Sequence, residues 1–260
     1  MKKMVLALTT VAAFTGSALA ADLPAAPVYT KAPMMAPVAN WTGFYIFGGA
    51  GGGVWDADNF SINAAGNATT ISQRQGGDGW FGTVGAGYDW QFNTSWVAGI
   101  FADGQFGSLR GNITDPFNSL TGGVKLEDTW AAGVRLGYLV APNVYSYVNA
   151  GFTESFWNSA SLGSVVGTAP TVTTPSFNRN GWFVGGGVEN NLNIFGITAP
   201  GWFMKTEYRA AYFNRATLAE SNIATGALTG NSTSFHPLVQ TISTSLVYRF
   251  NWGGPVVAKY

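Results

Sequence analysis

The alternation of apolar and polar residues most constrains how this chain can fold. Between Trp80 and Phe92 the even positions carry large apolar residues, alanine or glycine, and the odd positions include Thr83, Asp89 and Gln91 among glycines. A β-strand points successive side chains to opposite faces, so this segment has one apolar and one polar face. The pattern returns in later segments of about ten residues, which predicts a sheet between water and an apolar phase.

Charged residues follow the same division in the expected strands. Most of them lie on the face opposite the large apolar residues, and only Asp128 and Glu154 lie on the apolar face. An Arg or Lys on the lipid face at mid-membrane costs roughly 2–4 kcal/mol. The distribution therefore indicates that the apolar face contacts hydrocarbon. The inward charges are Asp89, Asp103, Glu127, Arg135, Glu189, Lys205, Glu207, Arg209 and Arg249.

The N-terminus has the order of a secretory signal. Lys2 and Lys3 precede an apolar stretch, and Ala18 and Ala20 form an A-x-A cleavage site. The stretch is shorter than the roughly twenty residues of a membrane helix. We expect a signal peptide over residues 1–20, a Pro-rich periplasmic leader over 21–40, a barrel over 41–250 and a C-terminal tail over 251–260.

Composition excludes several kinds of function. The chain has no cysteine and a single histidine, which argues against a Cys/His zinc site, and we expect no metal and no cofactor. Cleavage after Ala20 would leave eleven basic and thirteen acidic residues, which argues against a nucleic-acid partner. His236 with nearby Ser232 and Ser234 is the one candidate for a histidine-activated nucleophile, and no orienting carboxylate is evident beside it. We therefore expect that the protein is not an enzyme.

Eight strand-like segments can be placed along the chain. Tight connections alternate with long polar ones, the rhythm of an up-and-down barrel with extended extracellular loops and short periplasmic turns. The sequence therefore predicts an all-β fold, an eight-stranded antiparallel up-and-down transmembrane β-barrel. The glycines at 48–53 leave the faces of the first segment unassigned, and the faces of the fifth segment are ambiguous. The segments span about 41–55, 80–92, 96–106, 126–140, 144–157, 182–192, 202–212 and 237–250.

A secreted β-sandwich or a lipocalin-like barrel is the alternative, because their strands also alternate. The position of the aromatic residues favours the membrane barrel. They gather near strand ends on the apolar face, as interfacial girdles do. These residues are Trp80, Trp90, Trp96, Trp130, Tyr138, Trp182, Trp202 and Tyr212.

Several motifs resemble one protein family. They are Trp41-Thr42-Gly43-Phe44-Tyr45, Gly181-Trp182, Glu207-Tyr208-Arg209, Tyr248-Arg249-Phe250 and the closing residues 253–260. With these the chain resembles the RopB-type small outer-membrane β-barrel proteins of Gram-negative bacteria, also described as porin-family or outer-membrane immunogenic proteins. The resemblance implies a location in the outer membrane and a C-terminal aromatic signal for the barrel-insertion machinery, carried by Tyr248, Phe250 or Tyr260. The first, third and fourth of the long loops are particular to this chain, so no loop-borne binding activity is carried over.

The barrel interior is expected to be closed, since about eight strands leave room for side chains and hardly for water. We expect a lumen polar network of Asp103, Glu127, Arg135, Glu189, Lys205, Glu207 and Arg209. The expected role is structural and surface-presenting, in a monomer whose partners are outer-membrane lipid and the insertion machinery. The alternatives are a narrow porin for passive diffusion of small solutes, and loops that bind a ligand, a host factor or another extracellular partner.

Overall fold

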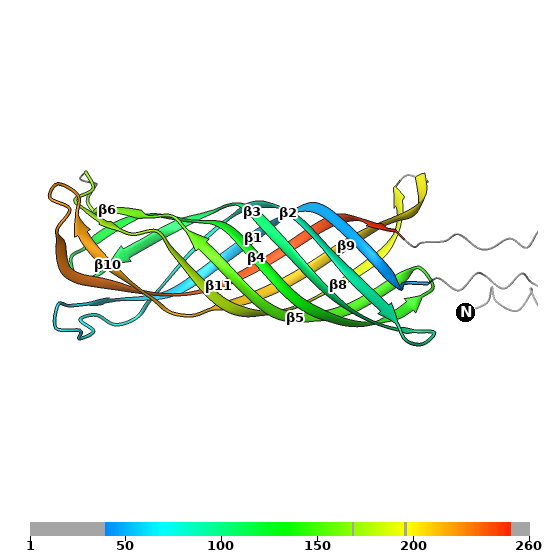
Figure 1. Ribbon diagram of the computed structural model, residues 1–260. Helices are drawn as coiled ribbons and strands as arrows, with labels where there is room; N and C mark the ends of the chain where they lie inside the picture. The colour runs from blue at the N-terminus through cyan, green and yellow to red at the C-terminus, as the bar shows by residue number, and fades with distance from the viewer. Residues whose placement is uncertain (1–39, 168, 195–196, 251–260) are drawn as a thin grey trace, which may run out of the picture. The chain divides into compact units, whose positions relative to one another are not determined.

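The computed structural model describes residues 40–167, 169–194 and 197–250, and these form eleven strands (Figure 1). None of the described residues forms a helix long and apolar enough to cross a membrane. The strands are β1 (Gly43–Ile62), β2 (Gln73–Gln91), β3 (Trp96–Asp115), β4 (Leu120–Ala141), β5 (Val144–Trp157), β6 (Ala160–Ser164), β7 (Val172–Thr174), β8 (Phe177–Ile194), β9 (Ile197–Phe213), β10 (Ala216–Asn222) and β11 (Leu228–Arg249).

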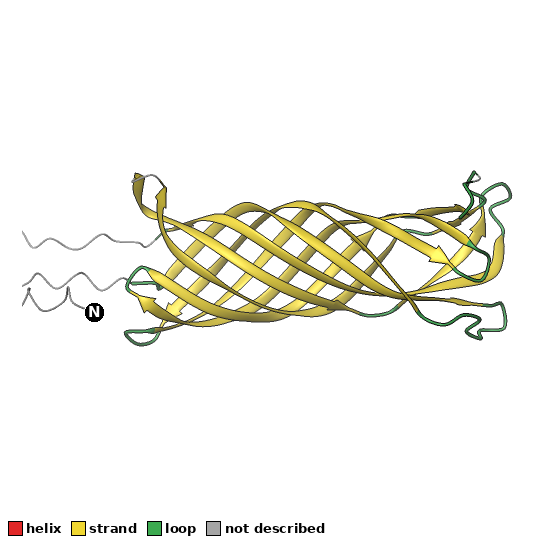
Figure 2. Cartoon of the chain, turned by 180° about the vertical axis from the view of Figure 1, so that it is seen from behind, coloured by secondary structure: helices red, strands yellow, loops and turns green. Residues whose placement is uncertain are grey.

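Eight of these strands close into a ring. The hydrogen-bonded order is β1-β2-β3-β4-β5-β8-β9-β11, and β11 pairs again with β1. Gly52, for example, lies between Trp80 of β2 and Ile242 of β11. Each neighbouring pair in the ring is antiparallel, which confirms the predicted eight-stranded up-and-down barrel (Figure 2). The start of β1 and the end of β11 lie together, at the end where β2 joins β3 through residues 92–95.

The remaining strands lengthen the wall at the opposite end. β6, β7 and β10 continue β5, β8 and β9 across short breaks, and they pair with β4, with each other and with β11. The expectation of long irregular loops over 56–79, 107–125, 158–180 and 214–236 was therefore wrong. These segments lie beyond the apolar phase, so their outward residues are polar and the contrast between faces disappears. Their inward residues are still buried, as Ala57, Asn59 and Ser61 show.

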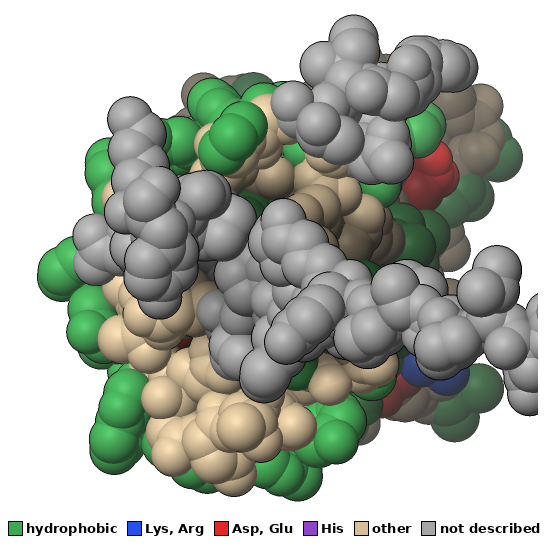
Figure 3. Space-filling model, turned by 90° about the vertical axis from the view of Figure 1, so that its right-hand side faces the viewer, with side chains coloured by type: hydrophobic (Ala, Val, Ile, Leu, Met, Phe, Trp, Pro, Cys, Tyr) green, Lys and Arg blue, Asp and Glu red, His purple; other side chains and the backbone are tan. Residues whose placement is uncertain are grey.

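An apolar band surrounds the middle of the barrel. On β4 it runs from Trp130 to Tyr138, and Val134 between them exposes 60% of its surface. That length matches the roughly nine to eleven residues with which a tilted strand crosses a bilayer. Hydrophobic side chains project around the rim when the barrel is seen from the end with the short turns (Figure 3). Exposed aromatic rings line the two margins of the band, on the turn side Phe44, Trp90, Trp96, Tyr138, Trp202 and Phe250, and on the far side Trp80, Phe106, Trp130, Phe152, Trp182 and Tyr212.

The structure assigns the faces that alternation left open. In β5 Tyr145 and Tyr147 point inward and are buried, whereas Val148 and Phe152 face outward. In β4 a bulge between residues 126 and 128 shifts the alternation. Leu126 is consequently buried inside the barrel, although simple alternation predicts that it faces outward with Trp130.

Glycine at position 51 allows the narrow lumen to be filled from the neighbouring strand β2. A Cβ atom on Gly51 would lie 2.3 Å from the carbonyl oxygen of Ile242 and 2.6 Å from Cζ of Phe81. Neither distance is compatible with van der Waals contact, and the carbonyl belongs to the neighbouring strand and cannot move aside. The inward face of β1 is therefore kept small so that the Phe81 ring can occupy the interior.

Candidate functional site

Four charged side chains meet inside the barrel near its short turns. We call Asp89, Arg135, Glu189 and Arg249 the turn-side quartet. They come from β2, β4, β8 and β11, and each is at most 4% exposed. Nε of Arg135 donates to Asp89 at 2.9 Å, and its Nη1 donates to Glu189 at 3.2 Å. Nη2 of Arg249 lies 2.8 Å from Asp89 and 2.7 Å from Glu189, so each cation contacts both anions.

Aromatic rings enclose this quartet. The guanidinium carbon of Arg135 lies 4.3 Å from the centre of the Tyr45 ring, and that of Arg249 lies 4.4 Å from the Trp41 ring. Such contacts stabilise a cation by about 2 kcal/mol when water is excluded. Nη1 of Arg249 also donates to the carbonyl oxygen of Trp41 at 3.3 Å. The two cations are therefore held by both carboxylates and π faces.

A second group of four charges lies further along the lumen. We call Asp103, Lys205, Glu207 and Arg209 the central quartet. Arg209 donates to both oxygens of Asp103, at 3.0 and 2.7 Å, and to Glu207 at 2.8 Å. Lys205 lies 3.8 Å from the other Glu207 oxygen, which also accepts a hydrogen bond from the Tyr147 hydroxyl at 2.7 Å.

Each quartet contains two cations and two anions, so each is formally neutral. Burying an isolated ion costs several kcal/mol, and close pairing offsets that cost only where the hydrogen bonds are also made. In both groups hydrogen bonds accompany the ion pairs, and among the described residues only Arg209 Nε and Arg249 Nη2, of the fully buried nitrogen and oxygen atoms of these side chains, lack a hydrogen-bond partner. The quartets therefore form cross-links between opposite sides of the wall, and their side chains occupy the lumen.

The structure brings six of the seven expected network residues into these quartets and separates the seventh. Glu127 lies in the β4 bulge, its side chain is 45% exposed, and it pairs with Lys125 at 3.1 Å. Its expected place in the network was wrong, because the bulge moves this position off the inward face. Asp89 and Arg249 were missing from the expected network. Their inward parity was already visible in the sequence, and that signal could have found them.

An aromatic layer closes the interior beyond the central quartet. The rings of Trp55 and Trp157 lie 5.3 Å apart, and Phe235 lies 5.7 and 5.2 Å from them. Phe177 stacks on Trp157 with ring centres 5.9 Å apart. Sequence reasoning missed this layer because Phe177 and Phe235 lie in segments that it treated as loops.

Little space remains beside the aromatic layer. A void of about 10 Å³ lies between Phe81, Leu109, Leu126 and Val239, together with residues of the β4 bulge. A single water molecule needs at least roughly 10–15 Å³ of such volume. This void is therefore too small for a continuous water column.

A pair of carboxyl groups lies in the lengthened part of the wall. Asp115 of β3 and Glu220 of β10 are both buried. The hydroxyl of Thr233 donates to Glu220 at 2.7 Å, and Asp115 accepts hydrogen bonds from Ser61 and Asn118. Burial raises the pKa of Glu220, and the nearby negative charge of Asp115 raises it further. Sequence reasoning did not find this pair because it placed both residues in or beside loops.

The raised pKa of Glu220 predicts a pH-dependent stability of the lengthened wall. The folded state binds the proton more tightly than the unfolded state, so stability is greatest below the usual pKa of about 4.5 and falls as pH rises through the window up to the raised value. Glu220→Gln should remove this slope and raise stability at neutral pH. Hydrogen exchange of the β7 and β10 amides between pH 4 and 8, corrected for intrinsic rates, measures the effect.

The matched control is Glu127→Gln, which alters a carboxylate that is nearly half exposed. It should keep the slope of the unaltered protein. If Glu220→Gln also keeps that slope, the carboxyl pair has no such role.

The remaining expected site residues fall into two groups. Tyr248 and Phe250 lie on the outward side near the end of β11, with ring centres 5.2 Å apart. Ala18, Ala20 and Tyr260 lie outside the described residues, so the cleavage site and the third candidate for the insertion signal stay predictions.

The candidate catalytic residues lie in β11. His236 is exposed, and in the backbone register of β11 with β1 it lies opposite Asp58. Ser234 is buried, and its hydroxyl accepts a hydrogen bond from Nη1 of Arg215 at 2.8 Å. The hydroxyl is thus engaged by a cation rather than by a base.

Comparison with known proteins places the chain in a family. The chain is 29% identical to a 31 kDa outer-membrane immunogenic protein of Brucella melitensis biotype 1 over 258 residues, which cover 96% of this chain and the whole relative. A Brucella suis biovar 1 protein with the same description is equally similar.

Solved structures with a similar fold are more distant. Outer membrane protein OprG from Pseudomonas aeruginosa is 10% identical with a TM-score of 0.48, covering 82% of this chain and 99% of that one. Neisserial surface protein A is 14% identical with a TM-score of 0.40, covering 80% and 98%. The family model for the outer membrane protein beta-barrel domain matches residues 6–254. The chain therefore belongs to the outer membrane protein β-barrel family and is a protein of the Gram-negative outer membrane.

Proposed function

We propose that the protein is a closed barrel whose role is structural and surface-presenting. It holds its lengthened wall and the connections at 63–72, 116–119, 165–167, 169–171 and 223–227 beyond the membrane. The observation that carries this proposal is the occupation of the lumen by two neutral quartets of buried charges, followed by an aromatic layer. Relatives described as outer-membrane immunogenic proteins support surface presentation.

The charged quartets and the aromatic layer block the lumen one after the other. A solute that passed the turn-side and central quartets would still meet Trp55, Trp157, Phe177 and Phe235. Moving the charged side chains aside would break close ion pairs in a poorly hydrated interior, which is costly. This arrangement favours a closed barrel over the alternative of a narrow porin.

Planar-bilayer conductance tests the proposal. The unaltered protein should give traces indistinguishable from those of lipid alone. Arg135→Ala with Arg209→Ala should also stay silent, because the aromatic layer is intact in that variant. Arg110→Ala, which alters an exposed arginine outside the lumen, is the matched control.

Each sample is first checked for folding by its mobility in SDS gels before and after boiling, because folded outer-membrane barrels commonly resist SDS until heated. Reproducible current steps in the unaltered protein that change in the Arg135→Ala, Arg209→Ala variant, and not in Arg110→Ala, would establish the narrow porin instead. The test does not depend on recovery of the double variant, since current steps from the unaltered protein alone contradict a closed lumen.

A further inference from the structure

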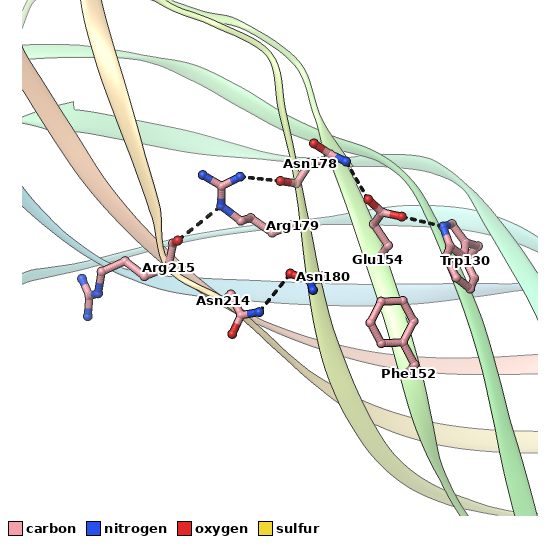
Figure 4. A pocket seen from close by; sticks show the side chains of 8 residues that line it. All are labelled: Trp130, Phe152, Glu154, Asn178, Arg179, Asn180, Asn214 and Arg215. Carbon is pink, nitrogen blue, oxygen red and sulfur yellow. Dashed lines mark hydrogen bonds between the residues drawn. The ribbon is translucent and has the colours of Figure 1, made fainter.

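A pocket of about 570 Å³ opens on the outer surface of the barrel, at the margin of the apolar band away from the short turns (Figure 4). Such a volume lies within the range of roughly 300–1,000 Å³ that is usual for small-molecule sites. Its lining comes from strands β4, β5 and β8 and from the connection that follows β9. The pocket therefore joins four parts of the chain at the edge of the membrane.

The side of the pocket toward the membrane is aromatic. The rings of Trp130 and Phe152 lie 5.4 Å apart and are inclined at 49° to each other. The two residues are 40% and 43% exposed, so the protein leaves part of each ring uncovered. Both belong to the aromatic margin, and such margins lie at the level of the lipid head groups. The pocket thus offers an apolar surface at the height where head groups begin.

The opposite side is formed by amide groups that have both donors and acceptors to spare. Nδ2 of Asn214 donates to Oδ1 of Asn180 at 2.9 Å. Nδ2 of Asn178 donates to Glu154 at 2.6 Å. Among the described residues, Nδ2 of Asn180 and the Oδ1 atoms of Asn178 and Asn214 make no further hydrogen bond within the protein. One free amide donor and two free amide acceptors therefore face a ligand.

The charges of the pocket cancel. Glu154 supplies one anion and Arg179 one cation, whose Nε donates to the carbonyl oxygen of Arg215 at 3.3 Å. The guanidinium of Arg215 points away from the other lining residues, and its Nη1 donates to the Ser234 hydroxyl at 2.8 Å (Figure 4). The pocket consequently has no net charge with which to select an ion.

We propose that this pocket binds a neutral sugar ring. A pyranose presents apolar C–H faces and a rim of hydroxyl groups, which match the aromatic side and the amide side of the pocket. Each hydroxyl both donates and accepts, so it pairs with free amide donors and acceptors alike. A purely apolar ligand would leave these amides unpaired, which costs free energy. Sugar rings reach this level as head groups of outer-leaflet glycolipids or as free saccharides.

The test uses the full chain in vesicles of phosphatidylcholine. Maltosyl diacylglycerol, an uncharged glycolipid, is added in steps, and the bound glycolipid per barrel is counted by native mass spectrometry. Phe152→Leu with Asn180→Ala removes one ring and the free amide donor, and it should weaken the apparent affinity about tenfold or more. The matched control is Phe106→Leu with Asn112→Ala, which alters an exposed ring of the same margin and an exposed asparagine of β3. Both control positions lie outside the pocket, so this variant should bind like the unaltered protein.

Comparisons on the unaltered protein decide the proposal even if the double variant fails to fold. Diacylglycerol without the sugar should bind at least about tenfold more weakly, and free maltose should displace the glycolipid. Displacement by maltose at concentrations equal to the glycolipid assigns the pocket to free saccharides, and displacement only at about tenfold higher concentrations or above assigns it to the glycolipid head group. Equal binding of the sugar-free lipid, no displacement by a large excess of maltose, or an equal loss in the control variant would overturn the assignment.

Discussion

Arg135→Ala should lower the free energy of unfolding by about 3–5 kcal/mol. The replacement leaves Asp89 and Glu189 inside the barrel with Arg249 as their remaining cation. It also removes the guanidinium from the Tyr45 ring. A buried carboxylate that loses its partner keeps the full cost of dehydration, so the loss far exceeds that of an exposed ion pair. Urea unfolding in lipid vesicles, followed by tryptophan fluorescence and by mobility in unboiled SDS gels, measures the change.

The control for this prediction is Arg74→Ala. Arg74 pairs with Asp56 at 2.8 Å, but its side chain is 67% exposed. Exposed ion pairs contribute about 0–1 kcal/mol. Equal effects of the two replacements would show that the turn-side quartet is no better shielded from water than the wall surface, and the closed lumen would lose its main support.

Val134→Arg should cost about 2–4 kcal/mol and reduce the yield of folded barrel. Val134 lies on β4 midway between Trp130 and Tyr138, and 60% of its surface is exposed to the apolar phase. The guanidinium would have to reach past four residues of strand in either direction to find water. Because the position faces away from the lumen, the change leaves both quartets intact.

Val166→Arg is the matched control, because Val166 is 84% exposed in the connection beyond β6. A surface change of this kind should stay within about 0.5 kcal/mol. The two variants are compared by urea titration in vesicles of the same lipid. If Val134→Arg is as stable as Val166→Arg, the outward face of β4 does not contact hydrocarbon.

Much of the wall could be predicted from local pattern. Alternation placed Trp130, Val134 and Tyr138 outward and Arg135 inward, and the structure agrees. The pattern is informative there because one face meets an apolar phase and the other a polar interior. Beyond the aromatic margin on the side away from the short turns this contrast is absent, so the same reasoning mistook the ends of the strands there for loops.

Bulges are a second reason why local sequence pattern cannot predict every side-chain direction. The bulge in β4 moves Leu126 inward and takes Glu127 away from the lumen. One extra residue reverses the assignment of all positions beyond it. The residues around 126–128 give no local sign of the bulge, because its position depends on how β5 pairs alongside.

The sequence by itself determined the two faces of most membrane strands, the aromatic margins and the inward parity of most charges. These properties depend only on the two-residue repeat of a strand. The tertiary structure alone decided which charge pairs with which and how Trp55, Trp157 and Phe235 meet. Such partners lie on strands far apart in the chain, and the closure and stagger of the ring bring them together, which no short stretch of sequence records.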